Sequence, residues 1–215
     1  QTICAGANTT FSITSAAALT LQWQVSTDGG VTYTNISNGA VYSGVTSATL
    51  TITGTIAGMN NYNYRCVAST QCGSTNSAAG ILSVNTAPAI NNQPQDVTLC
   101  TGSSNTFSVS TSGTGLSYQW QLSTAGCAGP WNNIPTANAS SYTLNGISAV
   151  QNNTAYRCVV TGTCTPAATS NCALLTVVTS VTVTTQPASQ TICEGSGVSF
   201  TAAGSGTGII YQWQL

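Results

Sequence analysis

Apolar and polar residues alternate along short stretches of the chain, which is the pattern of half-buried β-strands. The alternation is clear at residues 107–109 and 118–122, and it recurs at residues 11–13 and 21–25. Asp28-Gly29-Gly30 is a hairpin turn signal between the predicted strands at residues 22–26 and 31–36. Further strands are predicted at residues 31–36, 50–52, 64–68 and 80–84, and at 142–144, 156–160 and 173–178. About seven short strands in about 93 residues predict an all-β sandwich.

The predicted strands recur in the same order, so the chain is a tandem repeat. Tyr-Gln-Trp-Gln-Leu occurs at residues 118–122 and 211–215, and Leu-Gln-Trp-Gln-Val occupies residues 21–25. The predicted domains are residues 1–86, with an incomplete first strand, residues 87–179, and residues 180–215, which hold only three strands of a third repeat. We expect the parent protein to continue past residue 215 with another Tyr-x-Cys strand. The short Pro-bearing links between repeats predict a stiff string of domains.

The order of landmarks within a repeat is that of an immunoglobulin (Ig) domain. Trp120 lies on the third predicted strand, and Tyr156 precedes Cys158 by two residues on the sixth. The second-strand cysteine of antibody domains is missing, because Val109 takes its place. The tryptophan is therefore expected to pack on aliphatic and thiol side chains. The predicted core residues of this kind are Trp23, Trp120, Trp213, Tyr64, Tyr156, Cys66 and Cys158.

Four motifs give the chain a nearer likeness. Cys-x-Gly, Tyr-Gln-Trp-Gln, Tyr-Arg-Cys-Val and Gly-x-Cys are set in sequence rich in Ser, Thr and Asn. In these motifs the chain resembles the tandem Ig-like repeats of very large secreted or surface proteins of Bacteroidota-type bacteria. The resemblance covers all three repeats. It implies tandem Ig-like β-sandwich domains in an extracellular, structural or adhesive array.

Charged residues are nearly absent, and this excludes several functions. The only basic side chains are Arg65 and Arg157, the acids are Asp28, Asp96 and Glu194, and there is no histidine. Two arginines cannot neutralise a run of phosphates, so nucleic-acid binding is excluded. No apolar run is long enough for a membrane span. Because no base stands ready to activate a nucleophile and the acids fall in separate repeats, we expect no enzyme activity, no cofactor and no metal site.

Nine cysteines indicate disulfides and an oxidising, extracellular or cell-surface location. Cys127 and Cys172 occur only in the second repeat, so they are predicted to pair with each other. The shared candidates are Cys4, Cys72, Cys100 and Cys164. Within one Ig-like domain the Cys4-type and Cys72-type positions are about 40 Å apart, too far for a disulfide. Either such a cysteine reaches a different domain or the first strand leaves its standard path. Cys66 and Cys158 are then predicted to be buried free thiols.

Arg65 and Arg157 hold the same repeat position and should point away from the core, beside glutamines of the third strand. They are expected either to bond across the strands to glutamine or to make a repeated contact with another protomer or a glycan. The leading functional hypothesis is a non-enzymatic structural or adhesive segment forming a stiff stalk or fibre. Its partners would be neighbouring repeats and other protomers. The alternative is a carbohydrate-binding module array that uses Trp131, Tyr33 or Tyr42.

Overall fold

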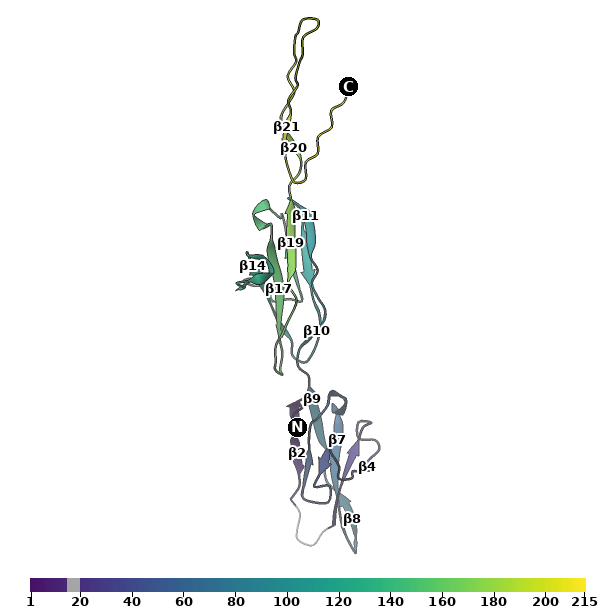
Figure 1. The fold of residues 1–215 in the computed structure, drawn as a ribbon. Coiled ribbons are helices and arrows are strands. Elements are labelled where there is room, and N and C mark those ends of the chain that lie inside the picture. Colours follow the sequence, from purple (N-terminus) through teal and green to yellow (C-terminus); the bar gives the residue numbers. More distant parts are fainter. Residues whose placement is uncertain (15–19) are drawn as a thin grey trace. The chain divides into compact units, whose positions relative to one another are not determined.

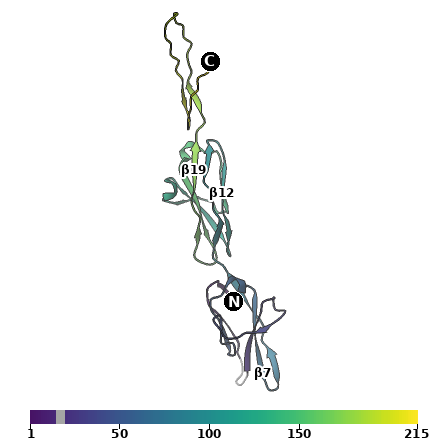
Figure 2. The same cartoon turned by 45° about the vertical axis from the view of Figure 1, so that its right-hand side comes forward.

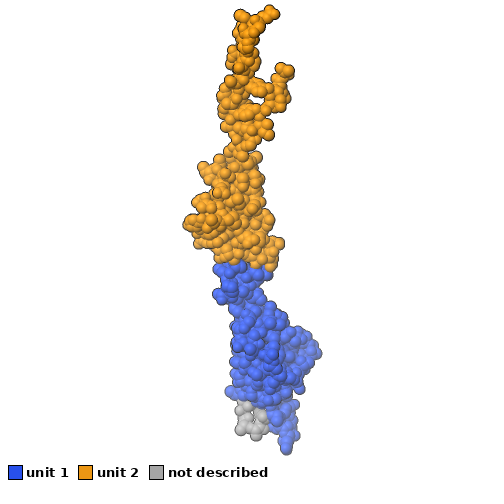
Figure 3. Space-filling view, viewed as in Figure 1, with its two compact units in different colours: residues 1–89, 111–117, 160–168 blue, residues 90–110, 118–159, 169–215 orange. Residues whose placement is uncertain are grey.

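The computed structural model describes residues 1–14 and 20–215 (Figures 1 and 2). The chain forms two compact units, coloured separately in Figure 3. Unit 1 consists of residues 1–89, 111–117 and 160–168, and unit 2 of residues 90–110, 118–159 and 169–215. Two segments of the second repeat, 111–117 and 160–168, thus belong to unit 1.

The first Ig-like domain has two sheets. One sheet has the order β1-β9-β7-β3-β4, with β8 paired to β7, and the other has the order β2-β6-β5. The strand β1 runs parallel to β9, whereas the other pairs are antiparallel. The elements are β1 (Thr2–Cys4), β2 (Thr9–Ser12), β3 (Thr20–Ser26), β4 (Thr34–Asn35), β5 (Tyr42–Ser43), β6 (Thr49–Ile52), η1 (Ala57–Met59), β7 (Tyr62–Thr70), β8 (Gly73–Asn76) and β9 (Gly80–Asn85).

The second Ig-like domain repeats this topology. Its larger sheet has the order β11-β19-β17-β14-β15, with β18 paired to β17, and β11 again runs parallel to β19. The strands β12 and β16 form the facing sheet, and β10 pairs with β13. The elements are β10 (Ala89–Asn92), β11 (Val97–Cys100), β12 (Asn105–Ser108), β13 (Ser110–Ser112), β14 (Ser117–Ser123), η2 (Gly126–Ala128), β15 (Asn132–Asn133), β16 (Ser141–Leu144), η3 (Ala149–Gln151), β17 (Thr154–Thr161), β18 (Ala168–Thr169) and β19 (Ala173–Val178).

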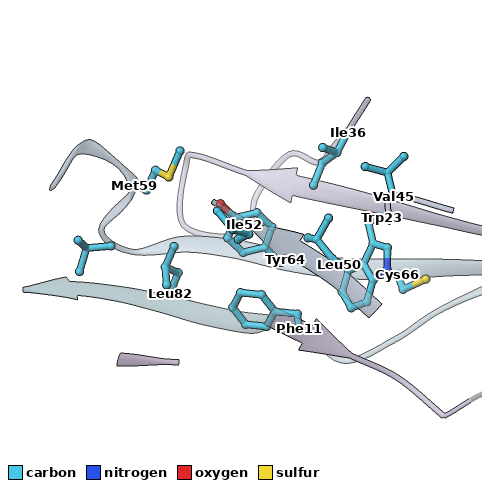
Figure 4. Packing of buried hydrophobic residues seen from close by; sticks show 11 residues of the cluster. Phe11, Trp23, Ile36, Val45, Leu50, Ile52, Met59, Tyr64, Cys66 and Leu82 are labelled. Atoms are coloured by element: carbon cyan, nitrogen blue, oxygen red, sulfur yellow. The ribbon is translucent and has the colours of Figure 1, made fainter. Parts of the chain in front are cut away.

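The core of the first domain lies between its two sheets (Figure 4). Strand alternation directs Trp23 of β3 and Cys66 of β7 inward, where the two residues are cross-strand partners. Phe11 stacks on Tyr64 with ring centroids 5.0 Å apart. The indole N–H of Trp23 donates to the Ser47 carbonyl at 2.9 Å, so its polar atom is satisfied.

The second domain builds the same core from equivalent residues. Trp120 and Cys158 are completely buried, and Phe107 stacks on Tyr156 with centroids 4.8 Å apart. Val109, which replaces the second-strand cysteine, is also buried. Aliphatic, aromatic and thiol groups therefore fill the space that an inter-sheet disulfide occupies in antibody domains.

The segment 180–215 differs from the sequence expectation. It forms β20 (Thr182–Thr185) and β21 (Ala203–Ser205), which pair with each other, but residues 211–215 form no strand. Trp213 is 56% exposed, so its prediction as a core residue is wrong. The physical reason is that a two-stranded ribbon offers no second sheet against which an indole could be buried.

Candidate functional site

An arginine, a glutamine, an asparagine and an aromatic ring form a row on the large sheet of the first domain. Arg65 lies opposite Gln24 on the neighbouring strand, and its Nε–H donates to Gln24 Oε1 at 2.8 Å. The Gln24 amide donates in turn to Asn35 Oδ1 at 2.8 Å. The guanidinium carbon lies 3.8 Å from the ring centroid of Tyr33. We call this set of four side chains the arginine row.

The second domain contains the same arginine row. Arg157 Nε–H donates to Gln121 Oε1 at 2.7 Å, and the Gln121 amide donates to Asn133 Oδ1 at 2.9 Å. The guanidinium carbon lies 4.3 Å from the ring centroid of Trp131. Both arginines are half-buried. The two basic side chains therefore make the cross-strand contact to glutamine and, in addition, cover one face of an aromatic ring.

The sequence predicts Tyr33 and Trp131 as candidate sugar-binding aromatics but does not place them against the arginines. Each ring stands two residues before the asparagine that the glutamine contacts, as Tyr33 before Asn35 and Trp131 before Asn133. This aromatic-x-Asn spacing, shared by both repeats, was the available signal. Tyr42, the other aromatic considered for sugar binding, packs against the core and lies with its hydroxyl 3.2 Å from that of Tyr64.

Two disulfides are present among the described residues. Cys127 bonds to Cys172, with Cα atoms 5.7 Å apart, and thereby joins η2 to the residue before β19. Cys4 bonds to Cys164, with Cα atoms 5.8 Å apart and a sequence separation of 160. The second bond lies within unit 1, which contains both residues, although they come from different repeats. The separation expected within one domain therefore does not apply to this pair.

The remaining cysteines are free thiols of two kinds. Cys66 and Cys158 are buried, and burial raises the pKa of both thiols, that of Cys158 to about 11. Such thiols are poor nucleophiles. Cys72, Cys100 and Cys193 are exposed. Thus Cys72 and Cys100, considered above for disulfides, have no disulfide partner among the described residues.

Asp28 and Asp96 accept hydrogen bonds from backbone N–H groups. The Asp28 carboxylate accepts from Ser26 Oγ at 2.6 Å and from the N–H groups of Val31 and Thr32. Hydrogen bonds from Ser26 and Thr32 hold the pKa of Asp28 well below its usual range. Asp96 accepts from the Leu174 N–H at 2.7 Å. Across residues 1–14 and 20–215, no group of three or more His, Cys, Asp or Glu side chains could hold a metal ion.

Solved structures establish the fold of the chain. The chain is similar to the Ig pair DIP-gamma IG1+IG2, with 18% identity and a TM-score of 0.60 over 82% of this chain and 92% of that chain. It is also similar to the titin I-band fragment I67–I69, with 16% identity and a TM-score of 0.62 over 87% of this chain and 65% of that chain. At identities this low, the structural similarity shows the fold alone. The fold is all-β, with two Ig-like sandwiches in tandem.

The chain belongs to the family described as a domain of unknown function (DUF8696), which it matches over residues 1–86 and 90–179. The two matches coincide with the two sandwiches. No curated protein matches the chain. The described residues contain no helix with the length and apolar character of a membrane span.

Proposed function

We propose that this chain is a non-enzymatic structural segment of an extracellular repeat protein, in which Ig-like domains are joined into a stalk or fibre. The observation that carries the proposal is the Cys4–Cys164 disulfide, which bonds one family repeat covalently to the next. A disulfide that closes so long a loop strongly restricts the unfolded chain. A segment built to resist unfolding under load benefits from such a bond.

Composition supports the non-enzymatic part of the proposal. With no histidine and no lysine, the usual proton acceptors for nucleophilic catalysis are missing from the sequence. Two disulfides in one chain support an oxidising, extracellular location. Near-absence of charge reduces repulsion between copies, which favours neighbouring repeats and other protomers as partners. Among the structural neighbours, DIP-gamma is bound to an Ig domain of Dpr11.

The alternative of glycan binding is less well supported by the site geometry. Sugar rings stack on open aromatic faces, yet Arg65 covers one face of Tyr33 and Arg157 one face of Trp131. Glycan binding that is lost in Trp131→Ala, with the domain still folded, would favour the alternative.

Single-molecule pulling from the two ends of the chain tests the structural proposal. In the oxidised protein, force passes directly from Cys4 to Cys164, so residues 5–163 cannot be extended. Reduction should add a release on the order of 550 Å, at about 3.3–3.6 Å per extended residue.

The matched control for the pulling experiment is Cys4→Ser, which without reductant should lengthen by on the order of 400 Å relative to the oxidised native chain, because the Cys127–Cys172 bond still bypasses residues 128–171. The Cys127→Ser variant should keep the short extension, because the force passes from Cys4 to Cys164 and on along residues 165–215 without crossing the Cys127–Cys172 bond. A wild-type oxidised chain that releases the full length would contradict the proposal.

A further inference from the structure

Cys100 is an exposed free thiol in the same backbone surroundings as the disulfide-bonded Cys4. In the parallel pair β1–β9, Cys4 lies opposite Asn85, and in the parallel pair β11–β19, Cys100 lies opposite Val178. In both cases the next N–H along the first strand donates to the carbonyl of that partner, at 2.8 Å and 3.0 Å. The first half of the Cys4–Cys164 site is therefore built twice.

The residue after each of these partners makes the same two hydrogen bonds. In unit 1 the Thr86 N–H donates to Thr114 Oγ1 at 3.0 Å, and the Thr114 N–H donates back to the Thr86 carbonyl at 3.1 Å. In unit 2 the Thr179 N–H donates to Thr207 Oγ1 at 3.0 Å, and the Thr207 N–H donates back at 3.3 Å. The second threonine follows the first by 28 residues in both units.

In unit 1 one further hydrogen bond extends this series of contacts to the residue before Cys164. The Thr163 N–H donates to the Thr114 carbonyl at 2.9 Å, and the next residue is Cys164, which closes the path to Cys4. The bonded Cys164 is buried. In unit 2 the equivalent series of strand pairing and hydrogen bonds runs from Cys100 through Val178 and Thr179 to Thr207.

We propose that Cys100 is one half of a second disulfide of this kind, whose other half is the Cys164-type cysteine of a following repeat of the same family. In the first repeat, Cys72 occupies the position that Cys164 occupies in the second repeat. Like Cys100, Cys72 is an exposed free thiol. It is then the half that bonds to the Cys4-type cysteine of a preceding repeat. Each repeat thus carries one cysteine for either neighbour, whether that neighbour lies in the same chain or in a second copy. This inference does not depend on what the array binds.

The bond forms by oxidation of two thiols, with loss of two protons and two electrons. A small-molecule disulfide such as oxidised glutathione accepts both electrons. One cysteine thiolate attacks it to form a mixed disulfide and releases one glutathione thiolate, and the second cysteine then displaces the other. The products are the protein disulfide and two molecules of reduced glutathione.

Insertion of a second copy of residues 87–179 after Thr179 tests the same-chain arrangement. The joint recreates the Thr-Ala-Pro sequence of residues 86–88. The inserted copy carries Cys100→Ser. The original Cys100, which alkylates as a free thiol in the folded native protein, should then be bonded to Cys164 of the inserted copy. Adding Cys164→Ser to the inserted copy should restore it as a free thiol. A Cys127–Cys172 bond in each copy reports that both are folded.

A mixture of two variants tests the second-copy arrangement in a Cys193→Ser background. The Cys72→Ser chain keeps Cys100, and the Cys100→Ser chain keeps Cys72. In glutathione buffer the mixture should form a Cys100–Cys72 dimer at least about tenfold faster than either variant dimerises alone, which corresponds to a difference of about 1.4 kcal/mol in activation free energy. Bonding in the insertion alone identifies the same-chain source, and bonding in the mixture identifies a second copy. Absence of the bond in both experiments overturns the proposal.

Discussion

Individual side chains show how these Ig-like domains dispense with the inter-sheet disulfide. Trp120 packs where it would in an antibody domain, but Val109 and the free thiol of Cys158 occupy the region of the missing bond. The Cys158 backbone N–H is bonded to Ser170 Oγ at 2.8 Å, so the residue is held by both packing and backbone contacts. Stability at this scale therefore comes from close packing of uncharged groups.

The first prediction concerns the buried indole. Trp120→Ala should lower the free energy of unfolding of the second domain by about 3–5 kcal/mol, because it removes a completely buried side chain and its hydrogen bond to Ala139. Urea denaturation measures the change. Trp213→Ala is the matched control, and its exposed indole should cost no more than about 0.5 kcal/mol. Equal effects at the two sites would refute the core assignment.

The second prediction concerns pH. Burial raises the pKa of Cys158 from 9.0 to about 11, so in that range the unfolded thiol gives up its proton before the folded one. The contribution is fully present below pH 9, and stability should fall as pH rises toward 11. Denaturation at pH 8, 9, 10 and 11 should show a smaller fall for Cys158→Val than for the native protein. An identical pH dependence would count against the buried thiol as a cause.

At the scale of elements, each arginine row connects three neighbouring strands of a large sheet. Arg157 on β17, Gln121 on β14 and Asn133 on β15 form a line across three neighbouring strands, and Trp131 lies just before β15. The short β15 has few ladder bonds of its own, with two residue pairs to β14. The row therefore fastens this short strand to the centre of the sheet.

The third prediction is a coupling between Arg157 and Trp131. A double-mutant cycle with Arg157→Gln and Trp131→Leu should give an interaction free energy of about 0.5–1 kcal/mol, the usual value for a cation lying over an exposed or half-buried ring. Unfolding in urea supplies the four stabilities. The matched control pairs Arg157→Gln with Trp213→Leu, which should be additive. A coupling no larger than that of the control would show that the contact contributes nothing.

The sequence was sufficient for most elements because alternation and the Trp and Tyr-x-Cys landmarks depend on local order. It also singled out the Cys127–Cys172 pair, since both cysteines are extra to one repeat. It left the partner of Cys4 open, because a bond between repeats depends on how segments from different repeats come together. Trp213 has the same local sequence as Trp120, but the three strands predicted for residues 180–215 already lack the partner strand that buries Trp120.

For the whole molecule, covalent connectivity follows a different path from the sequence. The loops closed by Cys4–Cys164 and Cys127–Cys172 overlap in the sequence. Two cross-links therefore constrain the chain between the first strand and β19. The first domain has no disulfide internal to its own repeat, since Cys66 and Cys72 are free. Its covalent protection depends on the bond to the second repeat.

The last prediction is a peptide map that this connectivity dictates. After thiol blocking and denaturation, trypsin can cut only after Arg65 and Arg157, giving residues 1–65, 66–157 and 158–215. Because Cys4 bonds to Cys164 and Cys127 to Cys172, the three pieces should remain one covalent species until they are reduced. Mass spectrometry reads this directly.

Two single substitutions make that map specific. Cys4→Ser should free only the piece 1–65, and Cys127→Ser should free only the piece 66–157, because each bond holds a different piece to 158–215. In both variants the third piece stays attached to the one that remains. If 1–65 separates from the native protein without reductant, the bond between repeats is absent, and with it the covalent basis for a load-bearing array.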